Sequence, residues 1–136
     1  MAHQPFTATV RIGNDPYTST IKTEGHDLVS DEPTNLGGQN AGPSPYGHLL
    51  AAIGACKTIT MRMYADRKGW ALESATVELT HSRERPGVER IDAVITLEGD
   101  LSDEQRTRIR EIADRCPVHR TITGDLTVAS TLAERV

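Results

Sequence analysis

The chain has 136 residues, of which 37% are hydrophobic, 25% charged and 4% aromatic, and its formal net charge is −4. This size and composition predict one soluble globular domain over residues 1–136, large enough to fold without disulfides or a structural metal. The acidic balance and the lack of a basic stripe argue against a nucleic-acid partner, and the longest apolar stretch, residues 49–56, is too short to cross a membrane.

The first third of the chain predicts a small antiparallel meander. Residues 6–13 and 17–23 alternate apolar and polar side chains around a turn at Asn14-Asp15-Pro16, and a short third strand follows at residues 26–30. Residues 31–45 read DEPTNLGGQNAGPSP and predict a loop. A loop of this length is usually functional or disordered in a compact domain.

The longest predicted helix begins with Ser44 as its N-cap and Pro45 in its first turn, and ends near Lys68 with Gly69 after it. Its first half, LLAAIGAC, is apolar nearly all round, so we expect this helix to be buried. Six short strands cannot cover such a helix alone. We therefore expect a second subunit to pack against it in a tight homodimer.

Two further alternating segments, residues 74–82 and 90–98, predict a hairpin around Arg85-Pro86-Gly87. The sequence from Ser102 to Gln105 is a capping box, which begins a second helix running to about Cys116.

A short turn and a last strand, residues 125–132, complete the predicted order βββ-α-ββ-α-β. This order indicates an α+β fold in which the helices lie on one side of antiparallel sheet.

The two cysteines, Cys56 and Cys116, each lie on the apolar stripe of a predicted helix. The stripes are Leu49, Ala52/Ile53, Cys56, Ile59/Thr60 and Met63 in the first helix, and Gln105, Ile109, Ile112/Ala113 and Cys116 in the second. Both thiols are therefore expected to point inward, where they could meet across a helix–helix contact. A lone inward cysteine is usually a small hydrophobic residue, but two of them favour thiol redox chemistry. The N-terminus lacks a secretory signal pattern, so we expect a cytoplasmic protein, where paired cysteines are more often catalytic or metal-binding than structural.

A reactive thiol needs a nearby cation or a helix N-terminus. Cys56 lies too far inside its helix for the helix dipole to act, so an arginine, lysine or histidine must reach it, and the sequence does not say which. Cys116 can act as a resolving thiol, which condenses with a sulfenic acid to a disulfide, if the two Cα atoms lie within about 7 Å.

Metal and cofactor sites are the alternatives. Cys56, Cys116, His48 and His119 could be counted as four zinc ligands, but only one short Cys-x-x-His spacing is present and Cys56 is mid-helix, so we expect no metal. The glycines of the 31–45 loop lack the pattern of a phosphate-binding loop, so we expect no nucleotide or other cofactor.

The segment DEPTNLGGQNAGPSPYGHLLAAIGACKTITMRMYADRKGW, with DRCPVHRTITG some fifty residues later, resembles the OsmC/Ohr family of osmotically inducible and organic hydroperoxide resistance proteins. The resemblance is closest to the OsmC-like branch and covers essentially the whole chain. Its Gly-Pro-Ser-Pro opening, Gly-Ala-Cys centre and Cys-Pro-Val-His-Arg block are specific in combination.

This resemblance implies an OsmC-like fold, an intertwined homodimer in which antiparallel sheets wrap around long buried central helices, with two sites at the interface. It also implies a thiol-dependent peroxidase of organic hydroperoxides. By position, Cys56 matches the peroxidatic cysteine of the family and Cys116 its resolving cysteine. An external dithiol would reopen the disulfide, and in the better-known branch this is a lipoylated protein.

The chain departs from the family pattern at the group that activates the thiolate. Family members commonly carry a glutamate early in the central helix, where it steadies an arginine of the N-terminal hairpin turn. Here Gly47 aligns with that acid. The residues that could replace the pair are His48, Tyr46 and Arg120, with Arg11 on a strand near the turn. The departure keeps open a non-catalytic protein that uses its pocket for a small apolar ligand.

Overall fold

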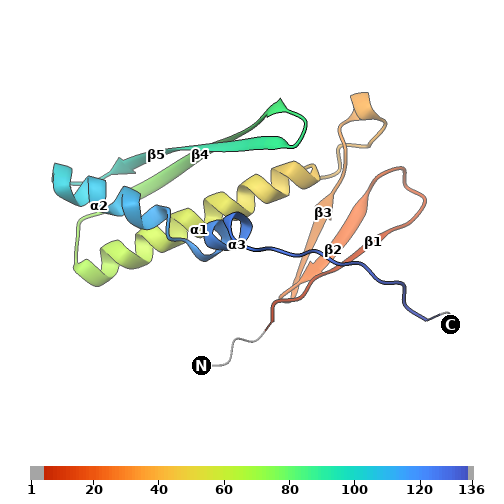
Figure 1. Cartoon of the computed structure of the whole chain (residues 1–136), viewed down its shortest axis with the longest axis horizontal. Helices are drawn as coiled ribbons and strands as arrows, with labels where there is room; N and C mark the ends of the chain where they lie inside the picture. The colour runs from red at the N-terminus through yellow and green to blue at the C-terminus, as the bar shows by residue number, and fades with distance from the viewer. Residues whose placement is uncertain (1–4, 135–136) are drawn as a thin grey trace. The chain divides into compact units, whose positions relative to one another are not determined.

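The computed structural model describes residues 5–134 and has an α+β fold with antiparallel sheets and three α-helices (Figure 1). In chain order the elements are β1 (Thr9–Ile12), β2 (Ser19–Thr23), β3 (His26–Ser30), a 3₁₀ helix (Thr34–Leu36), α1 (Pro45–Lys68), β4 (Ser74–Arg85), β5 (Val88–Glu98), α2 (Asp103–Ala113) and α3 (Pro117–Thr123). The chain divides after Ala51 into two compact units. The expectation of one domain over residues 1–136 stays a prediction.

The first unit contains the predicted meander, a three-stranded antiparallel sheet in the order β1-β2-β3. Ile21 at its centre pairs with Val10 on one side and Leu28 on the other. The β2–β3 connection is a two-residue turn in which both Glu24 and Gly25 have positive φ, 50° and 79°. Two positive φ values are required by the type of tight turn whose twist matches an antiparallel hairpin.

The loop that follows β3 is ordered around the buried carboxylate of Asp31. That carboxylate accepts hydrogen bonds from the Thr18 hydroxyl at 2.8 Å and from the backbone N–H groups of Glu32 at 2.7 Å and Ala41 at 3.2 Å. Burial alone raises the pKa of Asp31, but these donors and the Gln39 backbone outweigh it, so its pKa lies below the ordinary value. The loop therefore has a defined structure fixed by one acidic side chain.

The helix α1 has the predicted ends. The Ser44 hydroxyl accepts a hydrogen bond from the Gly47 N–H at 3.2 Å, and Gly69 follows the helix with a φ of 70°. The N-cap and the left-handed glycine identified the boundaries because both satisfy backbone groups that a helix end leaves unpaired.

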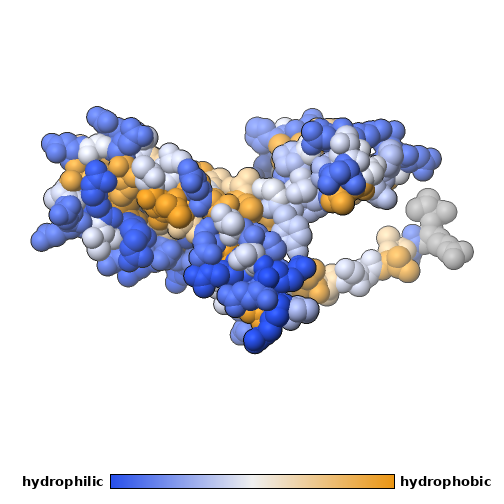
Figure 2. Space-filling view, turned by 90° about the horizontal axis from the view of Figure 1, so that it is seen from above, coloured by the Kyte–Doolittle hydropathy of each residue, from blue (hydrophilic) through white to orange (hydrophobic). Residues whose placement is uncertain are grey.

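The expected orientation of α1 was wrong. Its buried residues are Ile53, Gly54, Lys57, Met61 and Ala65. Ile59 and Met63, from the stripe expected to be buried, are 53% and 64% exposed. Because apolar side chains occur on more than one face of α1, hydrophobic spacing could not say which face its own chain covers. Figure 2 shows apolar surface, in orange, gathered on the unit that holds the β4–β5 hairpin.

The second unit has its core between α1, the β4–β5 hairpin and α2. Met61, Ile109 and Ala113 are completely buried there. They contact partly buried side chains of both strands and the connecting segments: Trp70, Ala75, Val77, Ile95, Leu97 and Leu101. The hairpin turns at the predicted Pro86-Gly87 and is longer than expected at its turn end.

The second helix begins as predicted and ends earlier. Ser102 and Gln105 form a reciprocal capping box at the start of α2. The helix stops at Ala113, so Cys116 does not belong to it; Cys116 is instead the N-cap of α3. Pro117 explains the difference, because a residue before proline avoids helical geometry, and Cys116 is extended with a ψ of 143°.

The predicted last strand is also absent. Residues 125–134 contain no strand and are exposed, so the observed order is βββ-α-ββ-α-α. An alternating sequence becomes a strand only where a neighbouring strand edge pairs with it, and within residues 5–134 no such edge pairs with this segment.

We expect the Asp31→Asn substitution to lower the melting temperature (Tm) by several degrees at pH 7, with the loss shrinking in acid. A carboxylate with a depressed pKa stabilises the fold above its unfolded pKa, and this contribution disappears as pH falls through the folded value. Thermal unfolding of both proteins between pH 7 and pH 2 measures the difference. Asp27→Asn is the control, because Asp27 forms an exposed ion pair with Lys22. An equal Tm difference at both extremes would contradict the role of the charge.

We expect Ser102→Ala to destabilise the protein by about 1 kcal/mol, the usual value for an N-cap. Urea unfolding measures the change in the free energy of unfolding. Thr107→Ala, an exposed change within the same helix, is the control and should have little effect. Equal effects of the two substitutions would show that the capping box does not stabilise α2.

Candidate functional site

The two thiols meet, although not through the helix stripes predicted for them. Cys56 projects from the middle of α1 and Cys116 lies at the start of α3, and both are free. Cys116 is completely buried, whereas Cys56 is partly exposed. The two sulfurs are close enough for Cys56 to raise the pKa of Cys116. One sulfur is therefore reachable from solvent and the other lies behind it.

The Cys-Pro-Val-His sequence supplies one backbone N–H group to each sulfur. The Val118 N–H donates to the sulfur of Cys56 at 3.5 Å, and the His119 N–H donates to the sulfur of Cys116 at 3.4 Å. Pro117 makes this possible, because it has no N–H of its own and its fixed φ begins the helical turn that points the next amides at the sulfurs.

The buried sulfur of the pair is held in its neutral form. Burial raises the pKa of the Cys116 thiol, and its interaction with Cys56 raises it further. The His119 N–H and the charge of Lys57 oppose this without reversing it. Cys116 is therefore a protonated thiol at neutral pH.

The residue after Cys56 provides the cation of the site. Lys57 is only 4% exposed, and its ammonium group has three partners. They are the Ala113 carbonyl at 3.1 Å, the Asp114 carboxylate at 3.4 Å and Nδ1 of His119 at 3.0 Å. Sequence reasoning required a cation near Cys56 but did not identify Lys57. The available signal was its position, four residues from both Ile53 and Met61 on the face that is buried.

Of the residues proposed to replace the missing family pair, Arg120 lies in the second unit with the thiols, and the other three belong to the first unit. Arg120 is exposed, and within residues 5–134 its side chain has no hydrogen bond or ion pair. His48 bonds the Val29 carbonyl through Nε2 at 3.0 Å. Arg11, on β1, and Tyr46, in the first turn of α1, are exposed residues of the first unit.

The alternative of a zinc site gains no support. No group of three or more His, Cys, Asp or Glu side chains within residues 5–134 is arranged to hold a metal ion. His119 faces the ammonium group of Lys57 through Nδ1, and His48 is bonded to a backbone carbonyl.

A cavity of about 590 Å³ borders Lys57 and His119 and is not lined by either cysteine. Its walls are Ile53, Lys57, Leu79, Glu89, Arg90, Ile91, Asp92, Ala93, Asp114, His119, Ile122 and Thr123. The acidic side chains in this wall are paired. Arg83 and His81 bind Glu89 and lower its pKa to about 2, and Asp92 pairs with Arg90. The remaining lining includes five apolar side chains, and a cavity with such side chains and paired charges suits an uncharged ligand.

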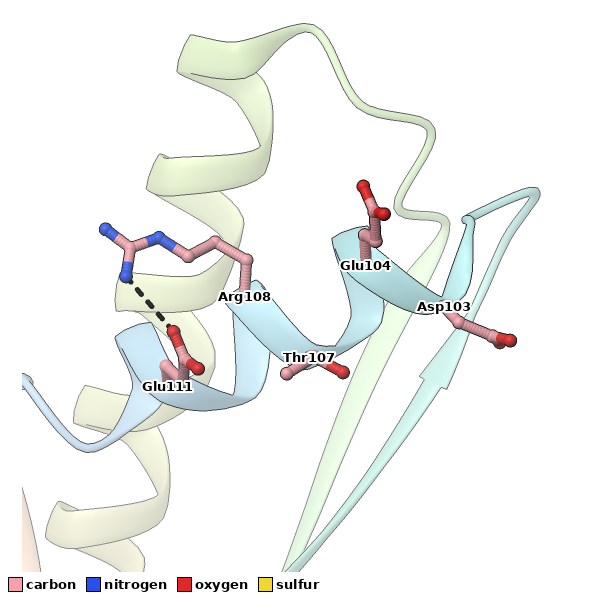
Figure 3. Close-up of a pocket in the computed structure, with 5 residues that line it drawn as sticks. All are labelled: Asp103, Glu104, Thr107, Arg108 and Glu111. Carbon is pink, nitrogen blue, oxygen red and sulfur yellow. Dashed lines mark hydrogen bonds and ion pairs between the residues drawn. The ribbon is translucent and has the colours of Figure 1, made fainter.

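A second depression lies along α2 and is unrelated to the thiols (Figure 3). Arg108 extends there toward α1, donates to the Tyr64 hydroxyl at 3.2 Å and pairs with Glu111 at 3.2 Å. These contacts attach α2 to α1, so we interpret this depression as structural.

No helix of residues 5–134 is both long enough and apolar enough to pass through a bilayer.

The comparisons with known proteins agree with the fold. The chain is similar to an OsmC-like protein from Mycoplasma pneumoniae (21% identity, TM-score 0.77, covering 98% of this chain and 100% of that one). It is also similar to an organic hydroperoxide resistance protein OsmC from Legionella pneumophila (20% identity, TM-score 0.66, covering 93% of this chain and 94% of that one). A third similar structure is the organic hydroperoxide resistance protein OhrB of Bacillus subtilis (18% identity, TM-score 0.61, covering 90% of this chain and 93% of that one).

Among curated proteins none matches the chain. Residues 37–131 match the family described as OsmC-like protein. This match spans more than half of the sequence and includes both cysteines and Lys57. The chain belongs to the OsmC-like protein family.

Proposed function

We propose that this protein is a thiol-dependent peroxidase that reduces organic hydroperoxides, and hydrogen peroxide more weakly, through a two-cysteine cycle. The observation that carries the proposal is that two consecutive amides, those of Val118 and His119, donate to the sulfurs of the partly exposed Cys56 and the buried Cys116. Two thiols held side by side in this way can pass from a sulfenic acid to a disulfide without a large movement of the chain. Family membership supports a redox or stress role.

In the proposed cycle, the Cys56 thiolate attacks the terminal oxygen of the hydroperoxide. The S–O bond forms as the O–O bond breaks, and the alkoxide leaves as an alcohol after taking a proton from water. Cys116 then attacks the sulfenic sulfur, and water leaves as the disulfide forms. An external dithiol restores both thiols by exchange.

The different environments of the two cysteines support this assignment of roles. A peroxidatic sulfur must be reached by its substrate, and Cys56 is the partly exposed sulfur, which accepts a hydrogen bond from the Val118 N–H. A resolving thiol does not need to be exposed before the first oxidation. The raised pKa of Cys116 keeps it protonated until then.

The proposal includes a homodimer in a reducing, cytoplasmic setting. Leu49, Ile59 and Met63 are exposed along α1, and a second copy packed on this helix would remove that apolar area from water. A reducing compartment supplies the dithiol that the cycle consumes. Neither a nucleic acid nor a membrane takes part.

Ligand binding without catalysis is the second candidate. The cavity beside Lys57 favours it, because five apolar side chains and paired charges line it and neither cysteine does. Gly47 favours it as well, since it leaves the first turn of α1 without the family glutamate. In this case a small uncharged apolar ligand binds the folded protein and raises its Tm.

We expect Cys56→Ser to abolish peroxide consumption. Cys116→Ser should retain one oxidation per subunit with at least about a hundredfold loss of steady-state turnover under a dithiol, because no internal disulfide can form. Consumption of cumene hydroperoxide and hydrogen peroxide, measured with a dithiol and with a monothiol, tests both variants. Ala55→Ser is the control, since it adds a hydroxyl beside Cys56 and keeps both thiols.

Full turnover by the Cys56→Ser variant would overturn the proposal. Absence of turnover in the wild-type protein with either reductant, together with a Tm that rises with an apolar ligand, would instead favour the binding protein.

A further inference from the structure

The peroxidase cycle makes no use of the most unusual charged group in the second unit. Lys57 is 96% removed from solvent in the middle of a helix whose neighbouring buried positions are Ile53, Gly54 and Met61. Lysine is rarely buried to this extent, because its ammonium group loses its hydration unless the protein replaces it. A lysine in this position therefore calls for an explanation beyond packing.

All three partners of Lys57 come from one short segment, residues 113–119. Ala113 offers one of the last carbonyls of α2, Asp114 a carboxylate and His119 a ring nitrogen. An ammonium group has three hydrogens and therefore satisfies all three acceptors. Because Cys116 lies between these partners, the lysine fixes the segment on both sides of the resolving thiol.

The contact with His119 also fixes the proton of that ring. Nδ1 accepts from the ammonium group, so the neutral ring carries its hydrogen on Nε2. No hydrogen bond of Nε2 is formed within residues 5–134, and His119 lines the cavity of the second unit. The tautomer is thus a measurable consequence of the lysine's position.

The charge of Lys57 is close enough to act on the thiol pair. It lowers the pKa of Cys116 against the effect of burial. Lys57 also directly follows Cys56 in α1. Its acidic partner Asp114 is 55% exposed in its side chain and shared with Arg110, so the negative charge that faces the lysine is largely in water while the ammonium group is not. The buried charge of this ion pair is therefore the positive one, and a buried positive charge near a sulfur favours a thiolate.

We propose that Lys57 is the positioning residue of the thiol pair: it holds residues 113–119 so that Cys116 meets Cys56, and its charge favours the thiolate that starts the cycle. This inference rests on the proposed function for its biological meaning. Its physical content, the state of two thiols, is measurable without any peroxide. It assigns to Lys57 the role of the cation near Cys56, which the sequence analysis required but did not identify.

The test compares Lys57→Met, which keeps length and removes charge, with Lys57→Arg, which keeps charge. Lys68→Met is the matched control, because it removes the same charge from an exposed position of the same helix. The rate of alkylation of Cys56 by iodoacetamide is measured by peptide mass spectrometry from pH 5 to pH 10. Diamide-driven formation of the Cys56–Cys116 disulfide is measured in parallel.

In Lys57→Met we expect alkylation of Cys56 at pH 7 to fall at least about tenfold and its pH profile to move upward, since a thiol whose pKa rises by one holds about a tenth as much thiolate at neutral pH. Disulfide formation should slow by a similar factor. Lys57→Arg should recover part of the alkylation rate, and Lys68→Met should stay within about twofold of the wild-type protein. A folded Lys57→Met with an unchanged pH profile and unchanged disulfide formation would overturn the proposal.

Circular dichroism and Tm establish whether Lys57→Met is folded, and Lys57→Gln replaces it if it is not. If neither folds, nitrogen chemical shifts of His119 in the wild-type protein decide. A hydrogen on Nε2 supports the proposal and a hydrogen on Nδ1 overturns it. A wild-type protein that consumes no peroxide would overturn the peroxidase but leave the alkylation profiles to decide the role of Lys57.

Discussion

The buried ammonium group of Lys57 joins α1 to the segment that carries the second thiol. Lys57 contacts the end of α2, the residue after it and the first turn of α3, while the next residue back along the same helix is Cys56. Consecutive helical residues point about 100° apart, so a lysine directed inward leaves the cysteine at the edge of the core. The partial exposure of Cys56 follows directly from the burial of its neighbour.

The Cys-Pro-Val-His sequence is the other half of this arrangement. Pro117 prevents α2 from continuing through Cys116 and is itself the first residue of α3. Cys116, expected as the last residue of one helix, is therefore the N-cap of the next. Its sulfur then accepts from the His119 amide, while the Val118 amide reaches the sulfur of Cys56. Pro117 therefore sets the direction of two N–H donors, those of Val118 and His119. The side chain of His119 in turn contacts the ammonium group of Lys57.

The sequence predicted the features that depend on local rules. The ends of α1, the tight hairpin turns and the capping box of α2 follow from residues that satisfy their own backbone. The thiol pair was predicted from the resemblance and from inward spacing. The inward face of α1 was assigned wrongly, because apolar side chains occur on more than one face of this helix and give no unique buried stripe. Lys57 was missed because a lysine is ordinarily a surface residue, and its burial depends on acceptors that lie 56 or more residues away. The strand predicted at residues 125–132 needed a neighbouring strand to pair with, and an alternating sequence does not show whether one is present.

Gly54 limits how the sequences of relatives can vary. It lies on the buried face of α1, and a Cβ atom at this position would come within 2.8 Å of a methyl group of Leu79 on β4. The helix backbone and the hairpin are therefore in direct contact one turn before Lys57. A relative with alanine or serine at this position needs the Leu79 methyl group to move away, or a smaller side chain in its place. The rotamer of residue 79 and the size of residue 54 are therefore linked within the core.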